Sequence, residues 1–98
     1  MRRGFSFHPM AEEELNEVAA YYEAESEGLG TAFLGEVEKA VRHILDYPES
    51  APLVNPLVRK KLVRRFPYNL MYSVTSKDIR ILAIASQKRR PFYWRGRK

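Results

Sequence analysis

The second half of the chain carries arginine and tyrosine side chains that could together cleave RNA. The 2′-hydroxyl of RNA can attack its adjacent phosphate when groups are present to accept a proton, to stabilise the phosphorane charge and to protonate the leaving oxygen. Arginine and tyrosine can share these roles where they cluster. The candidates are Arg64, Arg65, Tyr68, Arg89 and Tyr93. Their spacing does not say whether the five side chains converge.

Other catalytic arrangements have little support in the sequence. There is no cysteine, which excludes disulfides, thiolate zinc sites and cysteine nucleophiles. His8 and His43 are the only histidines, and we expect each to be structural or solvent-facing. Ser86 has no histidine placed to activate it, and Gly28-Leu29-Gly30 lacks the lysine of a phosphate-binding loop. We therefore expect no metal and no other cofactor.

Charge divides the chain into two unlike halves. Residues 1–50 hold 11 acidic and 4 basic side chains, a net charge of −7. Residues 51–98 hold one acid, Asp78, and 13 bases, a net charge of +12. This division indicates a binding face for a polyanion, either nucleic acid or an acidic protein segment. The alternative is that these charges lie on solvated surfaces and that their uneven distribution has no role in binding.

Aromatic residues alternate with the cations of the second half, as in proteins that bind unpaired bases. They are Phe66, Tyr68, Tyr72, Phe92, Tyr93 and Trp94. Aromatic residues at alternate strand positions are more often part of a core, and we expect this of Tyr72. For Pro91-Phe92-Tyr93-Trp94 the alternative is a plug that closes one end of the fold.

At 98 residues the chain is long enough for one domain, spanning residues 1–98. Apolar residues at helical spacing predict a helix from Pro9 to about Glu25 and a second that ends near Tyr47, before Pro48. Ser26 or Thr31 is the expected cap of the second helix. The acids Glu12, Glu13, Glu14 and Glu17 resemble a solvated helix face.

After residue 56 apolar and polar residues tend to alternate, which predicts strands at 58–65, 70–75 and 79–85. The strand at 79–85 is apolar on both faces, so we expect it to be the most central of the sheet. A short strand is also expected at 4–8. Three prolines predict a loop at 47–56. The predicted class is α+β, with an N-terminal strand, an antiparallel α-hairpin and a three-stranded antiparallel sheet, in the order β-α-α-β-β-β. No apolar run is long enough to span a membrane, so we expect a cytoplasmic protein.

Along nearly its whole length the sequence resembles the RelE/ParE superfamily of toxins from bacterial type II toxin–antitoxin modules, also known as plasmid stabilisation proteins. The resemblance rests on the order and spacing of Phe7-His8-Pro9-x-Ala11, Tyr21-Tyr22, Phe33-Leu34, Tyr47-Pro48, Arg64-Arg65-Phe66-Pro67-Tyr68, Leu70-Met71-Tyr72, Ile81-Leu82-Ala83-Ile84-Ala85 and Arg89-Arg90-Pro91-x-Tyr93-Trp94.

The resemblance implies a toxin that is neutralised by a cognate antitoxin. RelE-like members are endoribonucleases that cleave mRNA on the ribosome, whereas ParE-like members inhibit DNA gyrase and are not known as nucleases. Nuclease members tend to carry arginine directly after the tyrosine that opens the Tyr-Arg-Leu-x-Tyr strand, and Asn69 stands there. Arg89 matches a family arginine, but the Tyr93-Trp94 pair looks more ParE-like. Ser86 stands where many ParE-like members have histidine.

The resemblance therefore favours a ParE-like gyrase inhibitor. The alternatives are a RelE-like mRNA endonuclease, for which the catalytic residues would be the five candidates above, and a decayed member that only binds its antitoxin. The residues expected to bind the antitoxin or the target are Arg59, Lys61, Arg65, Arg89, Arg90, Tyr93, Trp94 and Arg95. The expected partners are the antitoxin and gyrase, or the ribosome and mRNA in the alternative, with no membrane.

Overall fold

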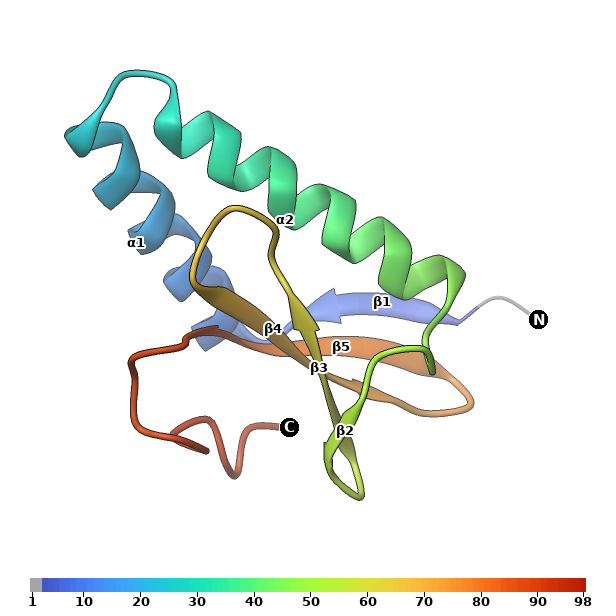
Figure 1. Cartoon of the computed structure of the whole chain (residues 1–98). Coiled ribbons are helices and arrows are strands. Elements are labelled where there is room, and N and C mark those ends of the chain that lie inside the picture. The colour runs from blue at the N-terminus through green and yellow to red at the C-terminus, as the bar shows by residue number, and fades with distance from the viewer. Residues whose placement is uncertain (1–2) are drawn as a thin grey trace.

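Two helices and five strands make up the fold in the computed structural model, which describes residues 3–98 (Figure 1). In chain order they are β1 (Gly4–Phe7), α1 (Pro9–Glu25), α2 (Leu29–Asp46), β2 (Leu53–Asn55), β3 (Val58–Leu62), β4 (Tyr68–Val74) and β5 (Asp78–Ser86). The strands form one sheet in the order β1-β5-β4-β3-β2. The helices lie over one face of this sheet, and the segment after β5 passes beneath the other (Figure 1).

The α+β class, the two helices and the antiparallel pairing of β3, β4 and β5 are confirmed, but the sheet has five strands and not three. β1 extends the sheet beside β5 in parallel, a pairing between distant segments that local alternation does not reveal. β2 forms inside the stretch predicted as a loop, where Pro52 and Pro56 leave only three residues to show a strand pattern. The central strand is β4 and not β5.

α1 begins where the sequence predicts, at His8 and Pro9. The Nδ1 atom of His8 accepts a hydrogen bond of 3.0 Å from the backbone N–H of Met10. Pro9 fills the first helical position, where its missing N–H leaves no bond unmade. The backbone N–H of His8 donates to the carbonyl of Ile81, so the start of α1 is fixed to β5.

The turn between the helices depends on Glu23 and two glycines. Gly28, at φ +86°, caps α2 in the left-handed conformation, in place of the predicted Ser26 or Thr31. The Glu23 carboxylate accepts hydrogen bonds from the N–H groups of Gly28 (2.8 Å) and Gly30 (2.9 Å). At Gly30 a side chain would collide with the carbonyl oxygen of Ala19, so only glycine lets the helices approach this closely.

The main core lies between the helices and the sheet. α2 contributes Phe33, Val37, Ala40 and Ile44, and the sheet contributes Leu70, Tyr72, Ile79, Ile81 and Ile84. Tyr72 is fully buried, as predicted, and its hydroxyl donates to the carbonyl of Pro48 at 2.8 Å. A smaller core on the opposite face holds Val58, Met71, Leu82, Ala83, Ala85 and Trp94.

β5 contains an irregularity that breaks its alternation. Met71 pairs with Ala83 and Tyr72 pairs with Ile81, so Leu82 has no partner on β4. Leu82 and Ala83 consequently both belong to the smaller core, while Ile81 and Ile84 belong to the main one. This explains why residues 79–85 are apolar at nearly every position.

Candidate functional site

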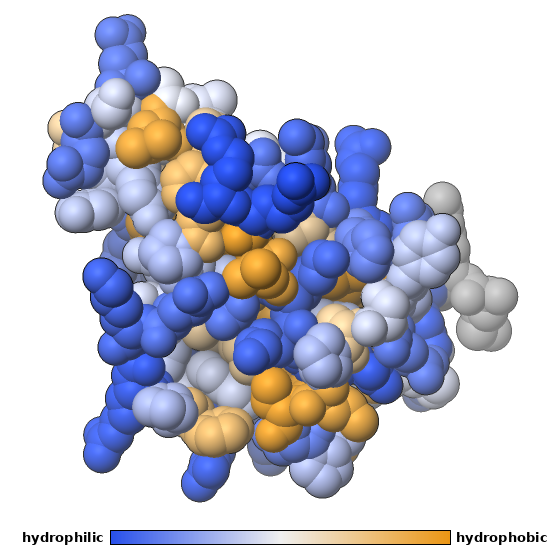
Figure 2. Space-filling model, viewed as in Figure 1, coloured by the Kyte–Doolittle hydropathy of each residue, from blue (hydrophilic) through white to orange (hydrophobic). Residues whose placement is uncertain are grey.

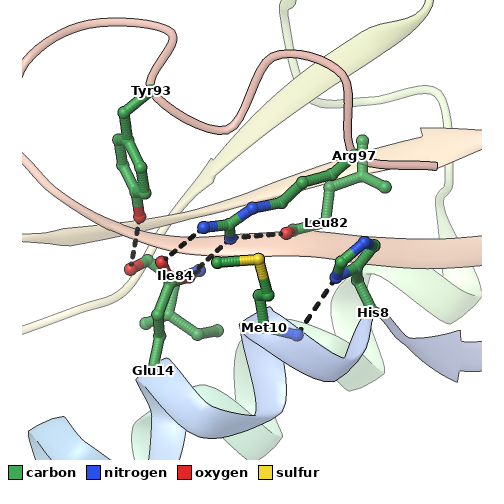
Figure 3. A network of polar contacts seen from close by, with 7 residues as sticks. All are labelled: His8, Met10, Glu14, Leu82, Ile84, Tyr93 and Arg97. Carbon is green, nitrogen blue, oxygen red and sulfur yellow. Dashed lines mark hydrogen bonds and ion pairs between the residues drawn. The ribbon is translucent and has the colours of Figure 1, made fainter.

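One edge of β5 pairs with a strand along only part of its length, and side chains cover the remainder of that edge. β1 pairs only with residues 78–81 of β5, so the same edge at residues 82–86 has no neighbouring strand. Its backbone groups bond to side chains instead: Ile84 N–H donates to Glu14 Oε1 (3.0 Å), Leu82 carbonyl accepts from Arg97 Nη1 (3.0 Å), and Ile84 carbonyl accepts from the Tyr93 hydroxyl (3.2 Å) (Figure 3). An edge that could pair with another chain is thereby covered.

Glu14 lies at the centre of this network. Both its oxygens pair with the Arg97 guanidinium, Oε1 with Nη1 and Oε2 with Nη2, each at 3.0 Å. The side chains are only 13% and 9% exposed, so this ion pair is largely removed from water. The hydrogen bond that Arg97 donates to Glu14 raises the pKa of Arg97, and burial, together with the Glu14 charge, raises the pKa of Tyr93. The prediction that Glu14 belongs to a solvated face is wrong.

Tyr93 and Trp94 fix the C-terminal segment to the sheet. The Arg89 guanidinium carbon lies 4.1 Å from the centroid of the Tyr93 ring, and that of Arg97 lies at 5.2 Å. Trp94 is 4% exposed and packs on the smaller core, which agrees with the plug interpretation of this segment. The neighbouring ring of Phe92 lies 5.5 Å from that of Trp94, centroid to centroid, and the guanidinium carbon of Arg95 lies 5.4 Å from the centroid of the Phe92 ring.

A depression of about 240 Å³ opens between this segment and the sheet. Its floor is apolar, formed by Val54, Met71 and Ala85. The polar groups around it come from Lys60, Asn69, Ser86, Gln87, Arg89 and Arg90, and the segment contributes Pro91, Phe92, Tyr93 and Trp94. No aspartate or glutamate is among its lining residues.

The five candidate nuclease residues do not form one cluster. Tyr68 packs on the helix side of the sheet, with its ring centroid 5.6 Å from that of Phe33. Tyr93 lies on the opposite side with the smaller core. Arg64 and Arg65 occupy the exposed loop between β3 and β4, where Arg65 has φ +73°. Arg89 and Tyr93 are in contact with each other.

The predicted binding residues have different surroundings. Arg59 donates from Nη1 to the carbonyls of Glu49 (2.9 Å) and Ala51 (2.7 Å), so it holds the loop before β2. Lys61 lines a groove between α2 and β3, next to Leu62, which is 54% exposed. Arg65, Arg90 and Arg95 are exposed. Figure 2 shows apolar patches over β2 and β3 among hydrophilic side chains; the exposed leucines there are Leu53, Leu57 and Leu62.

Two residues of this region escaped the sequence-based prediction of a site, namely Glu14 and Lys60. Glu14 stands among exposed acids of α1, and its partner is 83 residues away in the sequence. Lys60 could have been selected, because it follows Val58 by two positions and so shares its face of β3. Among residues 3–98, no group of histidine and acidic side chains could hold a metal ion. No helix in this part of the chain is long and apolar enough to cross a membrane.

Comparison with known proteins decides the family. The model of the ParE toxin of the type II toxin–antitoxin system parDE matches residues 5–91, nearly the whole chain. The chain belongs to the ParE toxin family. The fold of this ParE-family chain is also similar to a solved structure described as the chromosomal ParDE toxin–antitoxin system from P. aeruginosa. That match has a TM-score of 0.72 and 19% identity, and covers 86% of this chain and 95% of the other. Among curated proteins, no sequence matches this chain.

Proposed function

We propose that this ParE-family chain is a toxin that inhibits DNA gyrase in the cytoplasm and is neutralised by a cognate antitoxin. The observation that carries the proposal is the family match over residues 5–91. The separation of Tyr68 from Tyr93 on opposite faces of the sheet gives further support, because a nuclease needs its proton-transfer groups around one phosphate. Asn69 gives further support, because it stands where nuclease members carry arginine and its neutral amide supplies no positive charge to a scissile phosphate.

The surface offers an acidic partner both cations and apolar anchors. The described residues contain two ion pairs, Lys39–Glu36 and Arg97–Glu14, so the cations of β3 and the β3–β4 loop are free of acidic partners there. Leu62 is exposed between Lys61 and the loop arginines. Charge steers association, while burial of apolar side chains supplies most of the affinity. We expect the antitoxin to bring acidic residues together with apolar ones.

A supercoiling assay with purified gyrase tests the target. We expect the purified protein to inhibit supercoiling at roughly micromolar concentration, the weak end of the range for standard-sized interfaces, and the cognate antitoxin to relieve the inhibition. The same preparation is added to a translation reaction, and the mRNA is analysed for cleavage. Unaffected supercoiling would refute gyrase inhibition. Codon-specific cleavage of translated mRNA would identify the RelE-like alternative instead.

A further inference from the structure

The C-terminal segment is held by contacts that lie in its last residues, 93–98. Trp94 packs on the smaller core, and the hydroxyl of Tyr93 donates to a carbonyl of β5. Arg97 makes its two-contact ion pair with Glu14 of α1 (Figure 3). These partners belong to α1 and to the sheet. The last residues of a second copy of the chain therefore fit the same positions equally well.

Residues 88–92, here called the hinge, join these last residues to the end of β5 and are weakly held. The N–H groups of Lys88 and Arg89 donate to Ser86 over 3.2 and 3.1 Å, at the long end of the range for such bonds. Arg89 also contacts the Tyr93 ring. Every residue of the hinge is exposed. Opening the hinge gives up this one contact and two long hydrogen bonds, and it uncovers little apolar surface.

Two features make the closed hinge unfavourable. Phe92 has φ +60°, the left-handed conformation that crowds the Cβ atom of any residue except glycine. Lys88, Arg89 and Arg90 are consecutive cations, and neither ion pair of the described residues includes them. Adjacent like charges favour an extended chain. A short hinge under strain, attached to a firmly held end, is the condition that favours exchange of that end between two copies.

We propose that this chain forms a symmetric dimer in which two copies exchange residues 93–98. Trp94 of each copy then packs on the smaller core of the other, and Arg97 of each pairs with Glu14 of the other. The extended hinge spans at most about 16–18 Å, so the two folds lie close together. The exchanged contacts are the same as those of the single chain. The balance is therefore set by the relief of the hinge against the freedom lost on association, which a higher concentration offsets.

Two charge reversals test the exchange, because neither variant can form the ion pair alone. Arg97→Glu places a carboxylate against Glu14, and Glu14→Arg places a second guanidinium against Arg97. In an equimolar mixture, the native Glu14 of the first variant meets the native Arg97 of the second only in an exchanged dimer. The variants are refolded from urea, separately and together, and size-exclusion chromatography with light scattering measures the mass. We expect the mixture to elute at twice the 11.5 kDa of one chain, and each variant alone to remain near that single mass.

The hinge is tested with the ion pair intact. The wild-type chain, refolded over a range of concentrations, should form the same dimer, and sedimentation equilibrium gives its association constant. Phe92→Gly removes the cost of the left-handed conformation and should lower that constant roughly tenfold for each of the two hinges. Arg65→Gly is the matched control, since Arg65 also has a positive φ, +73°, but lies in the β3–β4 loop. It should leave the constant within about twofold.

A wild-type chain of single mass at every concentration overturns the proposal, and so does a mixture of the charge variants that stays at single mass. Dimerisation of each charge variant alone to the same extent as the mixture would also overturn it, because the copies would then associate without the exchanged pair. Equal effects of Phe92→Gly and Arg65→Gly would exclude the hinge as the cause of the exchange.

Circular dichroism checks that each variant is folded. If the charge variants do not fold, the hinge comparison decides, because it keeps the native pair. The exchange goes beyond the proposed inhibition of gyrase and does not depend on it. None of these results bears on the gyrase assay, so the two proposals fail separately.

Discussion

Glu14 on α1 and Arg97 near the end of the C-terminal segment face each other through two contacts of 3.0 Å. α1 covers one face of the sheet and the segment covers the other, so this pair connects the two layers around the edge of β5. Glu14 also accepts from Ile84 N–H, and Arg97 also donates to the carbonyl of Leu82. This ion pair thus covers the unpaired edge of β5. It also anchors the C-terminal segment, which covers the second face of the sheet.

Arg97→Met should lower the free energy of unfolding by about 3 kcal/mol, because it leaves the Glu14 carboxylate buried and uncompensated. That figure is the low end for breaking a buried pair, as both side chains keep some contact with water. The double variant Glu14→Gln/Arg97→Met should recover part of the loss. Urea denaturation followed by circular dichroism measures both.

The matched control is Lys39→Met, which breaks the other ion pair, with Glu36 at 3.6 Å. The Lys39 side chain is 76% exposed, so this change should cost less than about 1 kcal/mol. A loss for Arg97→Met no larger than that for Lys39→Met would show that the pair with Glu14 does not anchor the segment.

Gly30→Ala and Gly35→Ala should change stability in opposite directions, although both lie in α2. A methyl group at Gly30 would meet the carbonyl oxygen of Ala19, and overpacking of this kind costs about 1–3 kcal/mol. At Gly35 nothing lies within 4 Å, so alanine should stabilise the helix by about 0.5–1 kcal/mol. Thermal unfolding of the two variants measures the difference. Equal effects would refute the close approach of the helices at Gly30.

Glu23 should make the helical hairpin sensitive to acid. Hydrogen bonds from the backbone of Gly28, and also of Gly30, lower the pKa of Glu23 below its usual 4.5. A carboxylate with a lowered pKa in the folded state contributes stability above its unfolded pKa and loses it as the pH falls through the folded pKa. Stability should therefore decrease below about pH 4.5, and Glu23→Gln should flatten this part of the profile.

Denaturation between about pH 3 and pH 6 measures the effect of Glu23, since this window brackets the usual carboxyl pKa. Glu38→Gln, on an exposed position of α2, accounts for the change in net charge. An identical pH profile for wild type and Glu23→Gln would show that these hydrogen bonds do not contribute.

The proposed antitoxin face should respond to charge reversal at Lys61 and Arg65. The double variant Lys61→Glu/Arg65→Glu should slow association with the antitoxin, and the effect should shrink at high salt because exposed charges are screened over about 8 Å at physiological ionic strength. Arg59 is left unchanged, because its side chain holds the loop at Glu49 and Ala51. Surface plasmon resonance at two salt concentrations measures the rates.

Lys77→Glu is the control for that pair of substitutions, as Lys77 lies in the turn between β4 and β5. An association rate for Lys61→Glu/Arg65→Glu that matches the control at low salt would exclude this strand and loop as the docking face.

The helices and the core were predictable from local sequence because their signals repeat every few residues. His8, Pro9 and the apolar positions of α2 stand where their spacing predicts. The parallel pairing of β1 with β5 has no local signature, and neither has the three-residue β2 between two prolines. Glu14 could not be told from its neighbours, because its burial depends on Arg97, which is distant in the sequence. The order of basic residues in the second half of the chain identified the cations of the candidate site, but it did not show which face of the sheet each cation occupies.

The pairing of Glu14 with Arg97 also constrains the order of events during synthesis. The two residues are 83 positions apart. At a translation rate of ~5–20 residues per second, roughly 4–17 s separate their appearance on the ribosome. During that interval the helical hairpin can form first, since its contacts are local, and each strand of the sheet is made before the segment that covers the second face. A nascent chain therefore passes through a stage in which apolar residues such as Met71 are exposed, and a partner that binds at this stage meets a surface that the finished fold hides.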